Sequence, residues 1–169
     1  MPARRLRPGT SKIGAPDDAE ATREAAIALL ARRDFASREL SERLIKHGCE
    51  EAMAARVVAE LLGQGVLDDA RYAQNFVTYH AGRGQGPVRI AAELRQRGIA
   101  PELIEAALAG GPDWRALARK VRRAKFGLQP PGSWAERARQ ARFLQYRGFS
   151  SDHIRAATGA EAETGCTDH

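Results

Sequence analysis

The side chains best suited to catalysis or metal binding in this 169-residue chain are four histidines and two cysteines. None stands at catalytic or metal-ligand spacing from a suitable partner, so we expect each histidine at a helix end or on the surface. Two cysteines without such partners are typical of a reduced, cytoplasmic protein. The residues concerned are His47, His80, His153, His169, Cys49 and Cys166.

Two short segments invite a more specific interpretation. Asp68-Asp69 could hold a metal ion, but the pair follows a glycine and precedes an apolar-periodic helix, which favours helix capping. The segment Gly82-Arg83-Gly84-Gln85-Gly86 resembles a phosphate loop, yet no strand precedes it and no Lys-Ser or Lys-Thr follows. We interpret it as a flexible turn. The sequence therefore predicts no enzyme, no cofactor and no metal.

Charge is the stronger signal. Residues 111–149 contain ten basic residues against Asp113 and Glu136, whereas residues 15–70 contain seven basic and twelve acidic residues. Arginine interleaved with Phe143 and Tyr146 predicts a surface for nucleic acid or an acidic protein. The alternative is an ordinary solvated face. The candidate binding residues are Arg115, Arg119, Lys120, Arg122, Arg123, Arg139 and Arg142, extended by Arg89, Arg95 and Arg97.

The elements that carry these residues are predicted to be helices. Alanine and arginine dominate, aromatic residues make up only 6%, and no apolar run approaches the length of a membrane span. Leu44, Leu94 and Leu144 are each followed four residues later by a glycine, so the same helix ending recurs every fifty residues. The predicted divisions are a disordered basic tail (1–18), three three-helix repeats (19–65, 66–110, 111–159) and a flexible tail (160–169).

Helical spacing also predicts which side chains of the third repeat are buried. The expected core stripe is Trp114, Leu117, Ala118 and Val121 in one helix. In the next helix it is Trp134, Ala138, Ala141 and Leu144. Phe143 corresponds to the polar Arg43 and Glu93 of the other repeats, so we expect it to be exposed.

Two further segments have a distinctive spacing. One is Gly65-x-Leu67-Asp68-Asp69-x-Arg71-Tyr72-Ala73-x-x-Phe76-Val77, and the other runs from Gly86-x-x-Arg89-Ile90 through Glu93-Leu94 to Gly98-Ile99. Both resemble the RecX family of bacterial RecA regulators. The resemblance covers about residues 22–157, and its third repeat is the loosest. The motif residues expected to be structural are Gly65, Leu67, Asp68, Asp69, Arg71, Tyr72, Phe76 and Gly98.

The resemblance implies a modular protein of tandem three-helix units that binds RecA and the RecA–single-stranded DNA filament along its groove. We expect the units to form an elongated, weakly curved helical array. Family members limit the recombinase, ATPase and co-protease activities of RecA, and so modulate DNA repair and the SOS response. Some also bind DNA directly. We expect a monomer, with exchange of helical units into a dimer as an alternative. The competing functions are a stand-alone helix-turn-helix DNA-binding protein and a protein-interaction scaffold.

Overall fold

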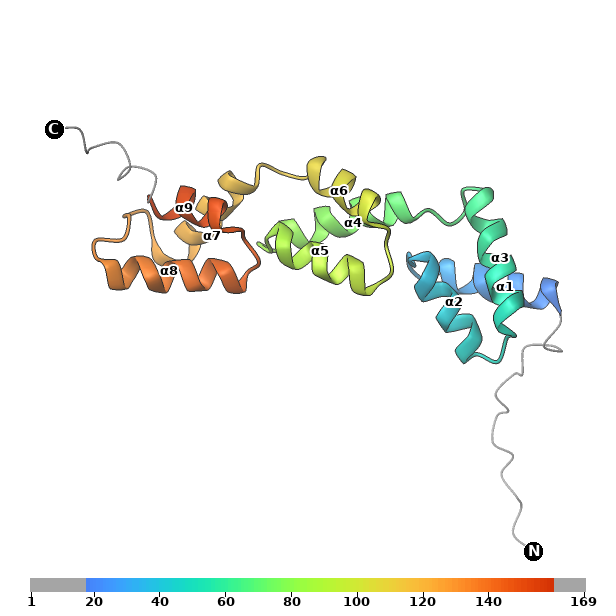
Figure 1. Cartoon of the computed structure of the whole chain (residues 1–169). Helices are drawn as coiled ribbons and strands as arrows, with labels where there is room; N and C mark the ends of the chain where they lie inside the picture. Colours follow the sequence, from blue (N-terminus) through green and yellow to red (C-terminus); the bar gives the residue numbers. More distant parts are fainter. Residues whose placement is uncertain (1–17, 160–169) are drawn as a thin grey trace, which may run out of the picture. The chain divides into compact units, whose positions relative to one another are not determined.

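The computed structural model describes residues 18–159, which contain nine helices and no strand (Figure 1). The all-α prediction is therefore confirmed for this part of the chain. The tails predicted at 1–18 (apart from Asp18) and 160–169, together with Cys166 and His169, lie outside the described residues. The chain divides into two compact units, one ending at Asp68 and the other beginning at Asp69. None of the helices in residues 18–159 combines the length and apolarity needed to cross a bilayer.

The first unit is one three-helix bundle. It comprises α1 (Ala19–Leu30), α2 (Ser37–Lys46) and α3 (Glu51–Gly63), each of which packs on the other two. Asp18 caps α1 by accepting hydrogen bonds from the N–H groups of Glu20 and Ala21. The core of this first bundle contains fully buried leucines on α2 and α3, namely Leu40, Leu44 and Leu61.

The second unit contains two further bundles. The second bundle is formed by α4 (Asp69–Gly82), α5 (Pro87–Gln96) and α6 (Pro101–Ala109). The third bundle is formed by α7 (Trp114–Phe126), α8 (Trp134–Tyr146) and α9 (Ser151–Thr158). The apolar core of the third bundle is small, with Ala118, Leu144, Phe149 and Ala157 buried.

The fifty-residue repeat of helix endings is present in the backbone. Gly48, Gly98 and Gly148 all have positive φ angles, of 99°, 80° and 89°. The N–H of the residue after each glycine donates to the carbonyl of the leucine five residues earlier, at 3.1 Å. This is the Schellman arrangement, and it buries the apolar residue that follows each glycine: Cys49, Ile99 and Phe149. The three bundles therefore share one local geometry at the end of their middle helix.

The third bundle departs from this register at the start of its middle helix. α2, α5 and α8 end fifty residues apart, but α8 begins three residues earlier than the repeat requires. Trp134 lies on this additional turn and is 82% exposed. The prediction that Trp134 belongs to the core stripe is wrong, because the other bundles have no helical residue at that position. Leu144 is fully buried, as predicted.

The second and third bundles meet through their main chains. The N–H of Gly86 donates to the carbonyl of Arg147 at 2.7 Å, and the N–H of Val88 donates to the carbonyl of Gly148 at 2.9 Å. A Cβ on Gly86 would overlap the Gly148 carbonyl, and a Cβ on Gly148 would overlap the side chain of Arg89. The segment 82–86 is a turn, as predicted, and its last residue takes part in the junction between the two bundles.

Candidate binding interface

The carboxylates of the third bundle already have partners within it. Asp113 caps α7 by accepting from the Ala116 N–H, and this hydrogen bond lowers the pKa of its carboxyl. Glu136 accepts from the Gly132 N–H at 2.7 Å. Asp152 accepts from Arg115 at 2.7 Å, which lowers the pKa of Asp152. Arg155 also pairs with Asp152, at 3.7 Å, so the three carboxylates of the described bundle are engaged before any outside partner binds.

On α7, the predicted binding residues fall into two groups. Lys120 and Arg123 are exposed, and no carboxylate of the described residues pairs with either. Arg115 donates a hydrogen bond to the Asp152 carboxylate. Arg119 is half-buried, and its positive charge helps to lower the pKa of Asp113. The outward side of α7 thus offers Lys120 and Arg123 to an anionic partner, while the other two cations lie against their own bundle.

Arg122 does not belong to the surface. Its side chain is only 4% exposed, and its two terminal nitrogens donate to the carbonyls of Gly127, Leu128 and Gln129 and to Oε1 of Gln140 at 2.9 to 3.3 Å. The prediction that Arg122 contacts a partner is wrong, because its guanidinium holds the α7–α8 loop. Gln140 occupies the position of Leu40 and Ile90 in the other repeats. It is buried like them, and its Oε1 accepts the hydrogen bond from Arg122.

On α8, Arg139 and Arg142 are both exposed, as predicted. The Arg139 guanidinium lies 5.5 Å from the centre of the Phe126 ring, and no carboxylate of the described residues pairs with either arginine. Phe143 is half-buried and packs edge-on against Phe126, with ring centroids 5.3 Å apart. The prediction that Phe143 is exposed is therefore wrong, because its ring packs against Phe126 and the core of the third bundle.

The three arginines predicted to extend the surface onto α5 have different environments. Arg89 forms an ion pair with Glu93 at 3.0 Å. Arg97 is half-buried, lies 5.1 Å over the Phe76 ring and donates to the Tyr72 hydroxyl at 3.1 Å. Arg95 is exposed. Tyr72 and Phe76 of the family motif therefore hold the end of α5 against α4 through Arg97.

Most of the other motif residues lie in or next to the segment that connects α3 to α4. Gly65 has a φ of 70°, which only glycine adopts without strain, and Leu67 is 2% exposed in the first core. Asp68 precedes α4 and Asp69 begins it, while Arg71 is exposed. Gly98 forms the Schellman ending of α5. Gly65 and Gly98 thus lie in turns and Leu67 in a core, while a structural role for Asp68, Asp69 and Arg71 stays a prediction.

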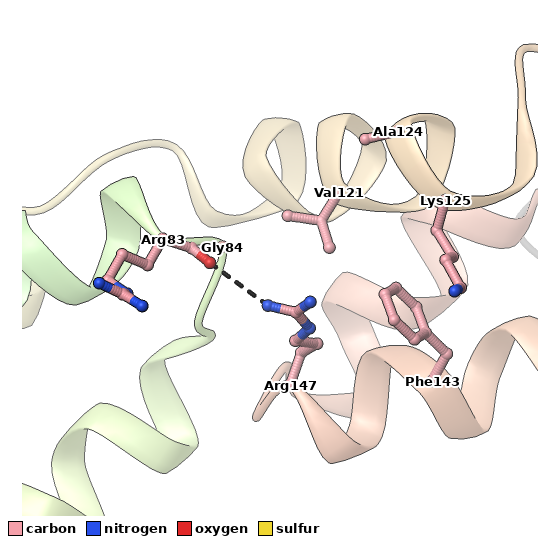
Figure 2. Close-up of a pocket in the computed structure, with 7 residues that line it drawn as sticks. All are labelled: Arg83, Gly84, Val121, Ala124, Lys125, Phe143 and Arg147. Carbon is pink, nitrogen blue, oxygen red and sulfur yellow. Dashed lines mark hydrogen bonds between the residues drawn. The ribbon is translucent and has the colours of Figure 1, made fainter.

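A cavity of about 260 Å³ lies at the junction of the second and third bundles (Figure 2). Lys125 and Arg147 reach into it beside Phe143 and Val121, while Arg83 contributes its carbonyl, which accepts from Arg147 at 3.3 Å. The Arg83 guanidinium instead binds the Tyr79 hydroxyl. Lys125 and Arg147 were not predicted as binding residues. The signal available for Arg147 was its place before the repeated glycine, which we interpreted only as helix-end charge.

His153 is the third residue of α9 and forms a capping box with Ser150, the residue before the helix. Its N–H donates to Ser150 Oγ at 3.4 Å, and its Nδ1 accepts from the Ser150 N–H at 3.3 Å. Burial lowers the pKa of His153 below its usual 6.5, and the charge of Arg115 adds to this, while Asp152 and Asp113 oppose it. The folded bundle therefore favours the neutral ring.

This gives a pH prediction for the third bundle. Because the unfolded chain binds the His153 proton more readily, the stabilisation is complete above about pH 6.5 and is lost as the pH falls below it. Urea unfolding followed by tryptophan fluorescence should give a lower midpoint at about pH 5 than at about pH 7.5. His153→Gln keeps an acceptor that does not titrate, so a pH dependence unchanged in this variant would contradict the prediction. Asp113 and Asp152 act only below about pH 3.8.

Comparison with known proteins identifies this arrangement. Family models of the first, second and third three-helix domains of RecX match residues 23–61, 68–108 and 113–158. The chain belongs to the RecX family. A regulatory protein RecX from Halorhodospira halophila is 47% identical over 145 residues, covering 85% of this chain and 90% of that protein. One from Ectopseudomonas mendocina is 42% identical over 139 residues, covering 82% and 93%.

The fold agrees with a solved RecX structure. The crystal structure of RecX from Lactobacillus salivarius superimposes with a TM-score of 0.75 at 20% identity, covering 86% of this chain and 97% of that one. Three tandem RecX three-helix domains are thus established here, and with them membership of a family whose relatives are named regulatory proteins. The predicted repeat boundaries and the binding residues other than Arg122 stay predictions.

Proposed function

We propose that this protein binds RecA and the RecA–single-stranded DNA filament and inhibits the recombinase, ATPase and co-protease activities. It would thereby modulate DNA repair and the SOS response in the cytoplasm, without catalysing a reaction itself. The observation that carries the proposal is the unneutralised charge of the third bundle of a RecX-family chain. Lys120, Arg123, Arg139 and Arg142 are exposed and face no carboxylate partner in the described residues.

The tandem arrangement of three bundles allows several weak contacts with the filament to act together. Once one bundle is bound, the next meets its site at a high effective concentration, so modest contacts give a tight complex on a repeating filament. A monomer held in this way would block incoming duplex DNA and hinder the subunit rearrangements linked to ATP turnover. Sedimentation with and without RecA filaments tests the monomer and its stoichiometry.

Charge reversal on α7 tests the proposal. Lys120→Glu with Arg123→Glu replaces two attractive contacts by repulsive ones, so we expect filament affinity to fall about tenfold or more and its salt dependence to weaken. Inhibition of RecA ATPase should fall in parallel, while helix content by circular dichroism stays the same. The matched control is Arg43→Glu with Lys46→Glu on α2, an equal change in net charge at exposed positions.

The two outcomes are clearly separated. Undiminished inhibition by the α7 double variant would remove the α7 cations from the mechanism. An equal loss in the α2 control would mean that net charge alone governs binding. Comparing the affinity for bare DNA with that for RecA–DNA filaments distinguishes the proposal from a stand-alone DNA-binding protein, which would bind both alike.

A further inference from the structure

The outward side of α8 carries the two most exposed aromatic side chains of the described residues. Trp134 is 82% exposed and Tyr146 is 84% exposed, at opposite ends of the helix. Twelve residues separate them, which corresponds to about 18 Å along the helix axis. Arg139 and Arg142 lie between them in sequence and are also exposed. We call these four residues the α8 face.

The α8 face is continuous and has no acidic member. At about 100° per residue, its four side chains fall within an arc of about 140° around the helix. Glu136, the only acid of α8, projects on another side and binds the Gly132 N–H. Gln140 and Leu144 point in the opposite direction and are buried. The aromatic rings and the guanidinium groups therefore share one solvent-facing side.

The corresponding sides of the other two bundles differ. At the positions of Arg142 and Tyr146, α2 has Glu42 and Lys46, and α5 has Ala92 and Gln96. Glu42 pairs with Arg38, and Arg89 of α5 pairs with Glu93, so arginines there are neutralised within their own helices. The extra turn that exposes Trp134 is also confined to α8. The α8 face is thus a feature of the third bundle alone.

The composition of the α8 face favours a nucleic-acid strand over a protein. The other side chains in the same arc are Ala135, Ala138 and Gln145, so there is no large aliphatic residue to form the apolar centre of a protein interface. Two flat rings on either side of two cations can engage both the bases and the phosphates of a single strand. Each base presents a face that stacks on an aromatic ring regardless of sequence.

We propose that the α8 face binds single-stranded nucleic acid, with bases stacked on Trp134 and Tyr146 and phosphates held by Arg139 and Arg142. The inference deepens the proposed function and rests on it for the biological setting, where the strand is the DNA of the filament. Its test uses a bare oligonucleotide, so the two proposals fail separately. A duplex is the poorer ligand, since its bases already stack on one another.

Trp134 itself supplies the direct test. The chain has two tryptophans, and Trp114→Phe leaves Trp134 as the only one. Titration of this variant with oligo-dT should quench Trp134 emission, and a duplex of equal length should quench it less. Trp134→Ala with Tyr146→Ala should weaken oligo-dT binding about tenfold or more. Arg139→Ala with Arg142→Ala should instead lower the salt slope by about one to two.

Leu128→Ala is the matched control, because Leu128 is another highly exposed apolar side chain of the third bundle, at 78%. It should leave oligo-dT affinity unchanged. Unaltered Trp134 emission at saturating oligo-dT would overturn the inference. So would full affinity of the double aromatic variant, or an emission change with RecA alone and none with oligo-dT. If the Lys120–Arg123 reversal leaves RecA inhibition intact while oligo-dT still quenches Trp134, only the α7 part of the proposed function fails.

Discussion

Gly86→Ala should separate the unfolding of the second and third bundles and cost about 3 kcal/mol, at the upper end of overpacking effects. The added Cβ would overlap the Gly148 carbonyl and the Phe149 nitrogen, so two main-chain segments must move apart. That movement would break the 2.7 Å hydrogen bond from Gly86 to Arg147 and the 2.9 Å bond from Val88 to Gly148. Calorimetry should then resolve an additional transition in the second unit.

Gly82→Ala is the control for this prediction. Gly82 ends α4 four residues before Gly86, and a Cβ there meets no atom within 4 Å. Removing a glycine from a helix end without a clash should leave stability unchanged or raise it by about 0.5 kcal/mol. A Gly86→Ala protein that unfolds like the parent chain would show that the main-chain contact does not couple the bundles.

Arg122→Met should destabilise the third bundle by about 3 kcal/mol, although arginine is the most abundant kind of surface cation in this chain. The substitution removes donors to three loop carbonyls and leaves Oε1 of the buried Gln140 without that partner. Methionine fills part of the space but accepts and donates almost nothing. Urea unfolding followed by tryptophan fluorescence measures the loss, and proteolysis within residues 127–132 should accelerate.

The neighbouring residue provides the control. Arg123 is exposed, with no carboxylate partner among the described residues, so Arg123→Met removes the same charge without opening the bundle. Its effect on the free energy of unfolding should stay within about 0.5 kcal/mol. Equal losses for the two variants would contradict the structural role assigned to Arg122. The two variants should also differ in function, because only Arg123 belongs to the proposed RecA-binding surface.

The fold was predictable because its signals are local and repeated. A leucine, a cation, a glycine and an apolar residue recur at fixed spacing, and each set specifies a helix ending through backbone hydrogen bonds that need no distant partner. Gly48, Gly98 and Gly148 could therefore be assigned from sequence. The junction was not predictable, because the contact of Gly86 with Gly148 joins segments about sixty residues apart.

The candidate site was only partly predictable. Helical spacing correctly exposes Lys120, Arg123, Arg139 and Arg142, but it treats every arginine as a surface residue. The fifty-residue repeat contained information that would have corrected the prediction for Arg122. Arg122 corresponds to Thr22 and Tyr72, and all three residues are buried. The prediction for Trp134 was wrong for the opposite reason. An apolar residue was assumed to be buried, but Trp134 lies on the additional first turn of α8, which the other two bundles lack. Burial of a charge or exposure of a ring depends on what the neighbouring loop supplies.

The contact between Gly86 and Gly148 also has a practical consequence for protein engineering. Two peptide hydrogen bonds contribute to that joint, and neither needs a particular side chain. Dyes, cross-linkers or new recognition residues can therefore be installed on the outward positions of α5 and α8 without loosening the pair of bundles. The requirement is that both glycines are retained.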